Sequence, residues 1–352
     1  MHDTVMQPGR RGRGPGVAAA GTPVGTLLTG LRATVAARGG IRTTGPLGDL
    51  TLDWRIFTEG RWIDPVGDAT VRHTRPRAAP VPRTAVRVPG GDAVQRVYAV
   101  AAASGVVVVE VENASPEAIA VAVRLGGADP AAVLHPSRPV GATEPDGAWS
   151  FPVPHRTSLR IAISTQPVAV RELDDADTVT RAWGRILERG MRVELPEALQ
   201  REVDAARADA LLAAPSAAAF AALEDWGFDD EAAAMWERLD GRARRTVRRR
   251  RAETGVLGAV RARLLADDGK VVDVLPGFDR EWLGASLAVH DAPTRDGRVS
   301  FALRWHGARP ALLWDVPEGR TIRASAIDPA PLGEDPPVER EVTERARGAN
   351  AP

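Results

Sequence analysis

The chain has 352 residues, of which 44% are hydrophobic and 26% are charged, a composition typical of a globular protein. The 46 basic and 46 acidic residues give a formal net charge of zero, which argues against a general electrostatic attraction to nucleic acid or to an anionic membrane. Cysteine is absent, which excludes disulfides, zinc–thiolate sites and thiol nucleophiles. At about 150 residues per domain, the length predicts two or three domains.

Residues 1–44 are predicted to form a disordered leader. Arg10 and Arg11 precede a mildly apolar stretch, residues 17–37, in an order that resembles a twin-arginine export signal. Threonines and Arg32 make this stretch too polar for such a signal. We therefore expect a cytoplasmic protein and keep export as the alternative. The chain has no run of about 18 apolar residues, so we expect neither a membrane span nor a membrane partner.

Residues 45–172 are predicted to form an antiparallel β-sandwich domain. The segment "VQRVYAVAAASGVVVVEVENASPEAIAVAVRL" gives three strand-like runs, separated by turn residues at 104–105 and 113–117. Short strands with turns at this spacing are typical of a sandwich. Apolar residues also alternate with polar ones in two further segments, "GDLTLDWRIF" (Leu50, Leu52, Trp54, Ile56) and "HRTSLRIAIS" (Leu159, Ile161, Ile163).

Residues 173–266 change to the helical period and are predicted to form a helical hairpin domain. Pro196 marks a helix start, because its missing N–H has no partner there in any case. Leu199, Val203 and Ala206 then recur with helical spacing. Further helices are expected after Pro215, from residue 229, and over two arginine-containing segments up to residue 266. The short connections predict antiparallel neighbours, in a partial α/α barrel or a bundle.

Residues 267–328 are predicted to form a small C-terminal antiparallel β unit, and residues 329–352 a disordered tail rich in Pro, Glu and Arg. In "RVSFALRW" one face carries Val299, Phe301, Leu303 and Trp305, and the other carries polar residues. "HGARP" is then a turn and "ALLW" the returning strand.

The domain order and several phrases resemble the six-hairpin glycosidases, whose catalytic domain is an α/α barrel, in their actinobacterial form. The phrases are "GDAVQRVYAV", "VEVENASPEAIAVAVRL", "FPVPHRTSLRIAI", "AALEDWGFDDEAAAMW" and "VSFALRWHGARPALLW". The resemblance implies a leading sandwich, helical hairpins and a trailing sheet. A full barrel of about twelve helices needs well over ~150 residues, whereas this helical segment is shorter, so at most half a barrel is expected. No catalytic motif matches, and the resemblance assigns no catalytic residue.

Carboxylates gather around Trp226 in "LEDWGFDDE", where a barrel would place its site. Glycoside hydrolysis uses two carboxyl groups, so Glu224, Asp225 and Asp229 are the catalytic candidates. The favoured interpretation is different: Asp229 and its acidic neighbours cap the next helix and favour its dipole.

Tryptophan is unusually frequent, with nine residues against six Phe and one Tyr. Indole faces can stack on sugar rings, but buried tryptophan is common in cores. Trp54, Trp236 and Trp305 lie on apolar stripes and are expected to be structural. Trp62, Trp226 and Trp282 lie at loop-like places and are the candidates for exposure and ligand binding.

Seven arginines lie between Arg242 and Arg251. A nucleic-acid surface would need such a cluster, but it would also come with a net positive domain and stacking aromatics. A solvated or inter-domain ion-pair face is favoured, because the acidic stretches just upstream offer salt-bridge partners.

The segment from His290 to Asp315 contains two histidines, two tryptophans and four arginines. His290, Asp291 and His306 could in principle supply zinc ligands or a His–Asp pair, but isolated neighbours of this kind are common in loops and no metal is expected. A polar patch of Arg295, Arg298, His306 and Arg309 that contacts the helices is favoured, and His290, Asp291, Arg295 and His306 are kept as ligand-binding candidates.

Three functions follow as hypotheses. The leading one is a glycosidase-like protein that binds a saccharide and is catalytically inert. The alternatives are an active glycoside hydrolase with carboxylates near Trp226, and a non-enzymatic scaffold that binds an acidic partner through residues 242–251. No P-loop, dinucleotide fingerprint or H-E-x-x-H motif occurs, so no cofactor is expected. The sequence leaves the oligomeric state open.

Overall fold

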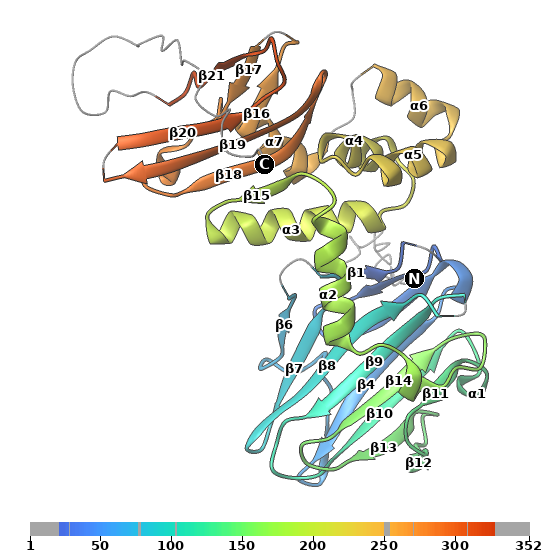
Figure 1. Ribbon diagram of the computed structural model, residues 1–352. Coiled ribbons are helices and arrows are strands. Elements are labelled where there is room, and N and C mark those ends of the chain that lie inside the picture. Colours follow the sequence, from blue (N-terminus) through green and yellow to red (C-terminus); the bar gives the residue numbers. More distant parts are fainter. Residues whose placement is uncertain are drawn as a thin grey trace, which may run out of the picture. The chain divides into compact units, whose positions relative to one another are not determined.

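The computed structural model describes residues 21–327, apart from 28, 77, 78, 103, 250–253, 270 and 308. The chain divides into two compact units, one up to Trp183 and one from Gly184 onward. Strands dominate the first unit and helices follow in the middle of the chain (Figure 1). The expected order of a strand-rich N-terminal region followed by helices is thus confirmed.

Two antiparallel sheets make up the first unit. One has the order β1-β2-β3-β4-β10-β13-β12, with β5 also paired to β4, and the other has the order β11-β14-β9-β8-β7-β6. The strands are β1 (Thr22–Gly25), β2 (Arg32–Val35), β3 (Ile41–Thr44), β4 (Thr51–Thr58), β5 (Arg61–Ile63), β6 (Arg72–Thr74), β7 (Arg83–Val88), β8 (Gly91–Val100), β9 (Val106–Asn113), β10 (Ile119–Gly126), β11 (Leu134–Pro136), β12 (Ala142–Thr143), β13 (Trp149–Val153) and β14 (Ser158–Ile163). A short helix, α1 (Pro130–Val133), precedes β11, and 3-10 turns lie at Gly45–Leu47 and Val170–Glu172.

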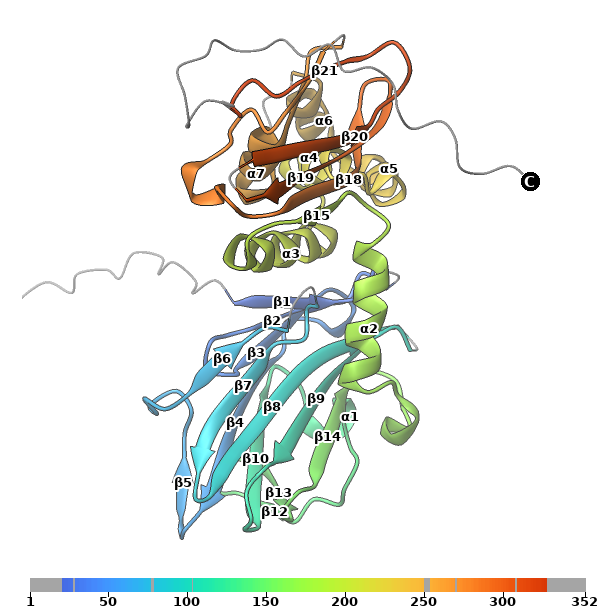
Figure 2. The ribbon, with the colours of Figure 1, turned by 60° about the vertical axis from the view of Figure 1, so that its left-hand side comes forward.

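Both sheets contribute side chains to one hydrophobic core. On β4 the residues Leu52, Trp54 and Ile56 are buried, while Asp53 and Phe57 point outward, as the alternation predicts. β8 adds Ala93 and Val97, and β10 adds Val121 and Val123. In Figure 2 strands β7 and β8 lie in front of β4 and β10. Because one face of each strand packs into this core, only the opposite, solvent-facing side chains can form a binding site.

The prediction of a disordered leader is wrong for residues 22–44, because β1, β2 and β3 lie there. They pair antiparallel with one another, and β3 pairs with β4. Each is only four residues long, and the glycine turns between them hide the alternation of Val24, Ala33, Val35 and Ile41, which are all buried. Arg10 and Arg11 lie outside the described residues, as does the predicted tail, residues 329–352.

Helices of the second unit begin and end close to the residues that the sequence marks. The N-cap of α3 is Pro196, and Ser216 caps α4 by accepting a hydrogen bond from the Ala219 amide at 3.1 Å. The alanine-rich α4 packs against α3, α5, α6 and α7. The helices are α3 (Glu197–Leu212), α4 (Ala217–Asp225), α5 (Asp229–Arg238), α6 (Gly241–Arg248) and α7 (Gly255–Leu264), and α2 (Ala176–Leu187) spans the division between the units.

The remaining strands of the second unit form two small sheets. β15 (Arg192–Glu194), β18 (Leu287–Thr294), β19 (Gly297–His306) and β20 (Arg309–Asp315) form an antiparallel sheet in that order. β16 (Leu265–Asp267), β17 (Val271–Val274) and β21 (Thr321–Arg323) form the other. In this sheet β17 and β21 run parallel, so the prediction of a single antiparallel β unit is wrong here. A 3-10 turn lies at Arg280–Trp282.

β15 changes the expected domain boundary. It lies inside the predicted helical segment but pairs with β18, with Val193 opposite Val289. The predicted helical domain, residues 173–266, and the predicted β unit, residues 267–328, therefore belong largely to one compact unit. Within the described ranges, no helix combines the length and the apolar character that crossing a membrane requires.

Candidate functional site

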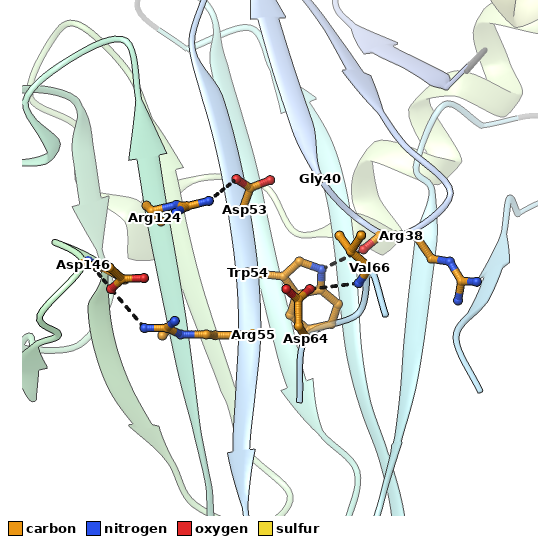
Figure 3. A pocket seen from close by; sticks show the side chains of 11 residues that line it. Arg38, Gly40, Asp53, Trp54, Arg55, Asp64, Val66, Arg124 and Asp146 are labelled. Atoms are coloured by element: carbon orange, nitrogen blue, oxygen red, sulfur yellow. Dashed lines mark hydrogen bonds and ion pairs between the residues drawn. The ribbon is translucent and has the colours of Figure 1, made fainter. Parts of the chain in front are cut away.

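A pocket of about 230 Å³ opens in the first unit, beside the middle of β4 (Figure 3). β4 pairs with β3 through residues 51–52 and with β5 through residues 56–58, so residues 53–55 lie in a gap between these two neighbours. The pocket forms at this gap and extends over the face of β4 and β10. Its lining residues are Arg38, Gly40, Asp53, Trp54, Arg55, Asp64, Val66, Ala122, Arg124, Asp146 and Ala148.

Charged pairs bridge the strands across this pocket. Arg55 donates to the Asp146 carboxylate at 3.0 Å, and Arg124 donates to Asp53 at 3.2 Å (Figure 3). Desolvation raises the pKa of the Asp146 carboxyl, but the Ala148 amide and Arg55 outweigh it, so the pKa lies below its ordinary value. Asp146 is therefore a carboxylate at neutral pH, able to accept hydrogen bonds from hydroxyl groups.

Aromatic side chains adjoin the pocket on the same face. Phe57 and Trp62 are cross-strand partners, and their ring centroids lie 5.3 Å apart in an edge-to-face arrangement. The Arg55 guanidinium lies 4.7 Å from the centroid of Trp62 and so connects the ring pair to the pocket. Trp62 is half-buried and Phe57 is 37% exposed. Of the three predicted exposed tryptophans, only Trp62 is solvent-accessible to this degree.

The charged residues of this pocket were not among the candidates predicted from the sequence. A signal was present, because the outward positions of β4 are Asp53, Arg55 and Phe57, an unusual run on a sheet face. Asp146, however, follows β12 in a loop, and Arg124 lies at the end of β10. The pairing of β10 with β4 on one side and with β13 on the other brings the three elements together.

Trp226 and Trp282 are buried, which corrects the expectation that they are exposed. Trp226 is 0% exposed, and its indole N–H donates to the Leu257 carbonyl at 3.2 Å. Trp282 is 3% exposed, and the Arg263 guanidinium covers its ring at 4.1 Å. Both rings fill the interior of the second unit, because the positions that look like loops in the sequence are short connections under neighbouring helices and strands.

The carboxylates near Trp226 separate into two groups. Glu224 and Asp225 form the end of α4 and line a pocket of about 480 Å³ in the second unit, together with Arg261 and Arg295. Desolvation raises the pKa of the Asp225 carboxyl, and the charge of Arg261 offsets part of this effect. The position at a helix C-terminus also disfavours a negative charge.

Asp229 begins α5 and lies apart from the lining of this second pocket. It accepts a hydrogen bond from Arg298 at 2.6 Å. Three acidic residues occupy the first turn of α5, as the dipole argument predicts. The N-cap itself is Phe228, so the predicted side-chain cap is absent at this helix start.

The histidines of the segment 290–315 do not converge. His290 Nε2 lies 3.9 Å from a Glu194 oxygen, Asp291 pairs with Arg192 at 2.9 Å, and His306 is exposed at the far end of β19. Asp291 has φ of 60° at a bulge in β18. Among the described residues, no cluster of three or more His, Asp or Glu side chains is placed to hold a metal ion.

The polar patch predicted from the same segment is only partly assembled. Arg298 does contact a helix, through Asp229 of α5. Arg295 instead bonds through its backbone amide to Asp267 at 2.9 Å. His306 and Arg309 lie at the opposite end of β19 and β20, where both are exposed.

In the arginine-rich helix α6, the described contacts of the arginines are with backbone carbonyl groups and an aromatic ring, and not with the expected carboxylates. Arg244 donates to the carbonyl groups of Trp236 and Glu237 at the end of α5, where a cation complements the helix dipole. Arg244 and Arg248 also lie 5.3 and 5.9 Å from the Trp236 ring. Over residues 242–249, no side chain makes an ion pair with a described acidic residue, so the expected ion pairs are absent there. The exposed side chains of Arg242, Arg245, Arg248 and Arg249 agree with a solvated face. Binding of an acidic partner stays a prediction.

Comparison with known proteins gives no assignment. No protein-family model matches the chain, and no curated protein matches it.

Proposed function

We propose that the protein is a glycosidase-like, saccharide-binding protein, in which the two sheets of the first unit form a β-sandwich and the β4 pocket holds one sugar unit. The observation that carries the proposal is the juxtaposition of the Phe57–Trp62 ring pair with opposed carboxylates and guanidiniums on one sheet face. Sugar recognition needs an apolar platform for the C–H face and polar groups of both kinds for the hydroxyl groups.

The charge balance of the pocket favours a neutral sugar. Its three guanidiniums, Arg38, Arg55 and Arg124, are matched by three carboxylates, on Asp53, Asp64 and Asp146. An anionic ligand would need an excess of guanidinium groups, whereas vicinal hydroxyl groups need donors and acceptors side by side. Small side chains, Ala122 and Ala148, keep the pocket open between them. The volume is below the ~300 Å³ typical of drug-sized ligand pockets, which suits a single hexose unit.

The experiment is a binding screen of the full chain against neutral glucans, mannans and galactans by affinity electrophoresis, followed by calorimetry on the best oligosaccharide. We expect Asp146→Asn to weaken binding by about tenfold or more, because a hydrogen bond to a charged group contributes ~1.5–3 kcal/mol. Trp62→Ala should weaken it similarly by removing the platform. Two controls should retain full affinity: Asp230→Asn, which makes the same change on the exposed surface of α5, and Leu283→Ala, which removes a side chain that is 50% exposed.

Two results would contradict the proposal. The first is the absence of binding to every neutral polysaccharide tested. The second is binding that is unchanged in both Asp146→Asn and Trp62→Ala.

The second candidate function is glycoside hydrolysis at the pocket of the second unit. The observation that favours it is the partly buried Asp225 carboxyl, whose raised pKa suits a general acid, with Glu224 lining the same pocket. Hydrolysis of a series of aryl glycosides and glucans tests this function. Activity should be present in the native chain, lost in Asp225→Asn and retained in Asp230→Asn. Equal rates in the native chain and in Asp225→Asn would exclude Asp225 as the acid.

A further inference from the structure

β20 ends the sheet order β15-β18-β19-β20, and its pairing is with β19 on one side. The other side of the strand presents backbone amide and carbonyl groups as an open edge. Its seven residues read Arg-Pro-Ala-Leu-Leu-Trp-Asp, and none of them is buried. Leu313 is 61% exposed, the second most exposed of the large hydrophobic side chains described. A long apolar strand at a sheet edge is a template for pairing with another strand.

The sequence of β20 is complementary to itself in the antiparallel direction. When two copies are aligned with Leu312 opposite Leu312, Arg309 lies opposite Asp315 at both ends of the pair. Between them, Pro310 lies opposite Trp314 and Ala311 opposite Leu313. Opposite charges directly across a strand pair stabilise it, and like charges destabilise it. Shifting the alignment by one residue removes both charge pairs and places the side chains of one copy on the other face.

We propose that β20 pairs with β20 of a second copy of this chain, about a two-fold axis at Leu312, and joins the two sheets into one. Arg309 and Asp315 are both exposed, and no ion pair links either of them to a described residue. Each is therefore placed to meet its counterpart from the second copy.

Pro310 agrees with this arrangement. Proline has no N–H to donate to β19, and so it suits a position whose amide faces the open edge. Alternate residues of a strand share that orientation, so Leu312 and Trp314 also direct their backbone groups outward. At the two-fold axis the two Leu312 residues exchange both backbone hydrogen bonds, and each Pro310 still accepts one through its carbonyl oxygen.

The strand pair is a small interface, so the expected dimer dissociates at about micromolar concentration. Sedimentation velocity of the full chain from about 1 to 200 µM should show a monomer–dimer equilibrium. Arg309→Asp places two like-charge pairs across the axis and should raise the dissociation constant by about tenfold. The double variant Arg309→Asp/Asp315→Arg restores opposite charges and should recover the native constant within about threefold. Arg242→Asp, the same change on α6, should leave it unchanged.

The absence of cysteine from the chain gives a second readout of the register. Leu312→Cys places the new thiol opposite its own counterpart, within the Cα separation that a disulfide needs. Mild oxidation should then produce a covalent dimer. In Leu313→Cys the counterpart is Ala311, so covalent dimer should form much more slowly.

Each of four outcomes would overturn the proposal. The native chain could stay monomeric over the whole concentration range. The dimer could persist unchanged in Arg309→Asp, or the double variant could fail to recover it while its circular dichroism spectrum is native. The Leu312→Cys and Leu313→Cys variants could cross-link equally fast.

Discussion

The substitution Arg207→Met tests how the second unit tolerates a buried cation. The Arg207 side chain is 4% exposed and lies between the rings of Trp226 and Phe228, with its guanidinium carbon 5.6 and 5.5 Å from their centroids. It donates a hydrogen bond to the Leu187 carbonyl and lies 3.7 Å from the Asp204 carboxylate. Methionine fills a similar volume but removes the charge and the donor.

The expected magnitude follows from two opposing terms. Desolvation is the main cause that lowers the pKa of Arg207 to about 10 from 12.5, and the charge of Asp204 partly opposes it. This shift corresponds to a cost of about 3 kcal/mol for holding the cation in the interior. Removing one partner of a buried ion pair costs about 3–5 kcal/mol in total, with the relief of desolvation already included. Asp204 keeps the hydrogen bond that Gln200 Nε2 donates to it at 2.9 Å, so the low end of this range applies. Arg207→Met should therefore lower the free energy of unfolding by about 3 kcal/mol, whereas Arg207→Met/Asp204→Leu should lie within about 2 kcal/mol of the native value.

Urea unfolding followed by far-ultraviolet circular dichroism measures this change, because most of the helices lie in the second unit. Arg201→Met is the matched control, since Arg201 lies on the same helix in an exposed pair with Glu197 at 3.7 Å. It should change stability by less than about 0.5 kcal/mol. A cost of Arg207→Met no greater than that of this control, or a double variant as unstable as the single one, would contradict the role of the buried pair.

Three further predictions concern the first unit. Burial is the main cause that raises the pKa of Tyr98, so folding favours the neutral phenol. The stability that Tyr98 contributes is present below pH ~10 and is lost as the pH rises above that value. Tyr98→Phe should therefore flatten the alkaline limb of a plot of thermal midpoint against pH. Gln95 is 0% exposed, and neither the oxygen nor the nitrogen of its side-chain amide has a hydrogen-bond partner among the described residues. Gln95→Met should therefore raise the free energy of unfolding by about 1–3 kcal/mol. A loss of stability would show that the side-chain amide is hydrogen-bonded. Gly39 has a φ of 83°, and a Cβ at this position would lie 2.4 Å from Nε1 of Trp54. Gly39→Ala should therefore lower the free energy of unfolding, measured with a chemical denaturant, by about 2–4 kcal/mol. A decrease below about 1 kcal/mol would contradict this close approach.

The candidate site shows where local pattern stops being informative. Trp62 and Trp226 look alike in the sequence, each beside charged residues and glycine. In the structure Trp62 lies on the outer face of a sheet, while Trp226 is fully buried and donates a hydrogen bond to the Leu257 carbonyl of α7. No local property separates them, because exposure depends on what other elements cover. The same holds for Asp146, which pairs with a residue 91 positions earlier in the chain.

The sequence by itself determined the alternation of β4, β14 and β19, the strand-like runs of β8, β9 and β10, and the starts of α3 to α5 near Pro196, Pro215 and Asp229. These features depend on neighbouring residues, through side-chain direction and terminal hydrogen bonding. Tertiary structure alone decided that residues 22–44 form strands, that β15 joins a sheet more than ninety residues later in the chain, and that a pocket opens at the gap beside β4. Those outcomes depend on pairing between distant segments, and the burial that stabilises such pairing exists only when the partner strand is already in place.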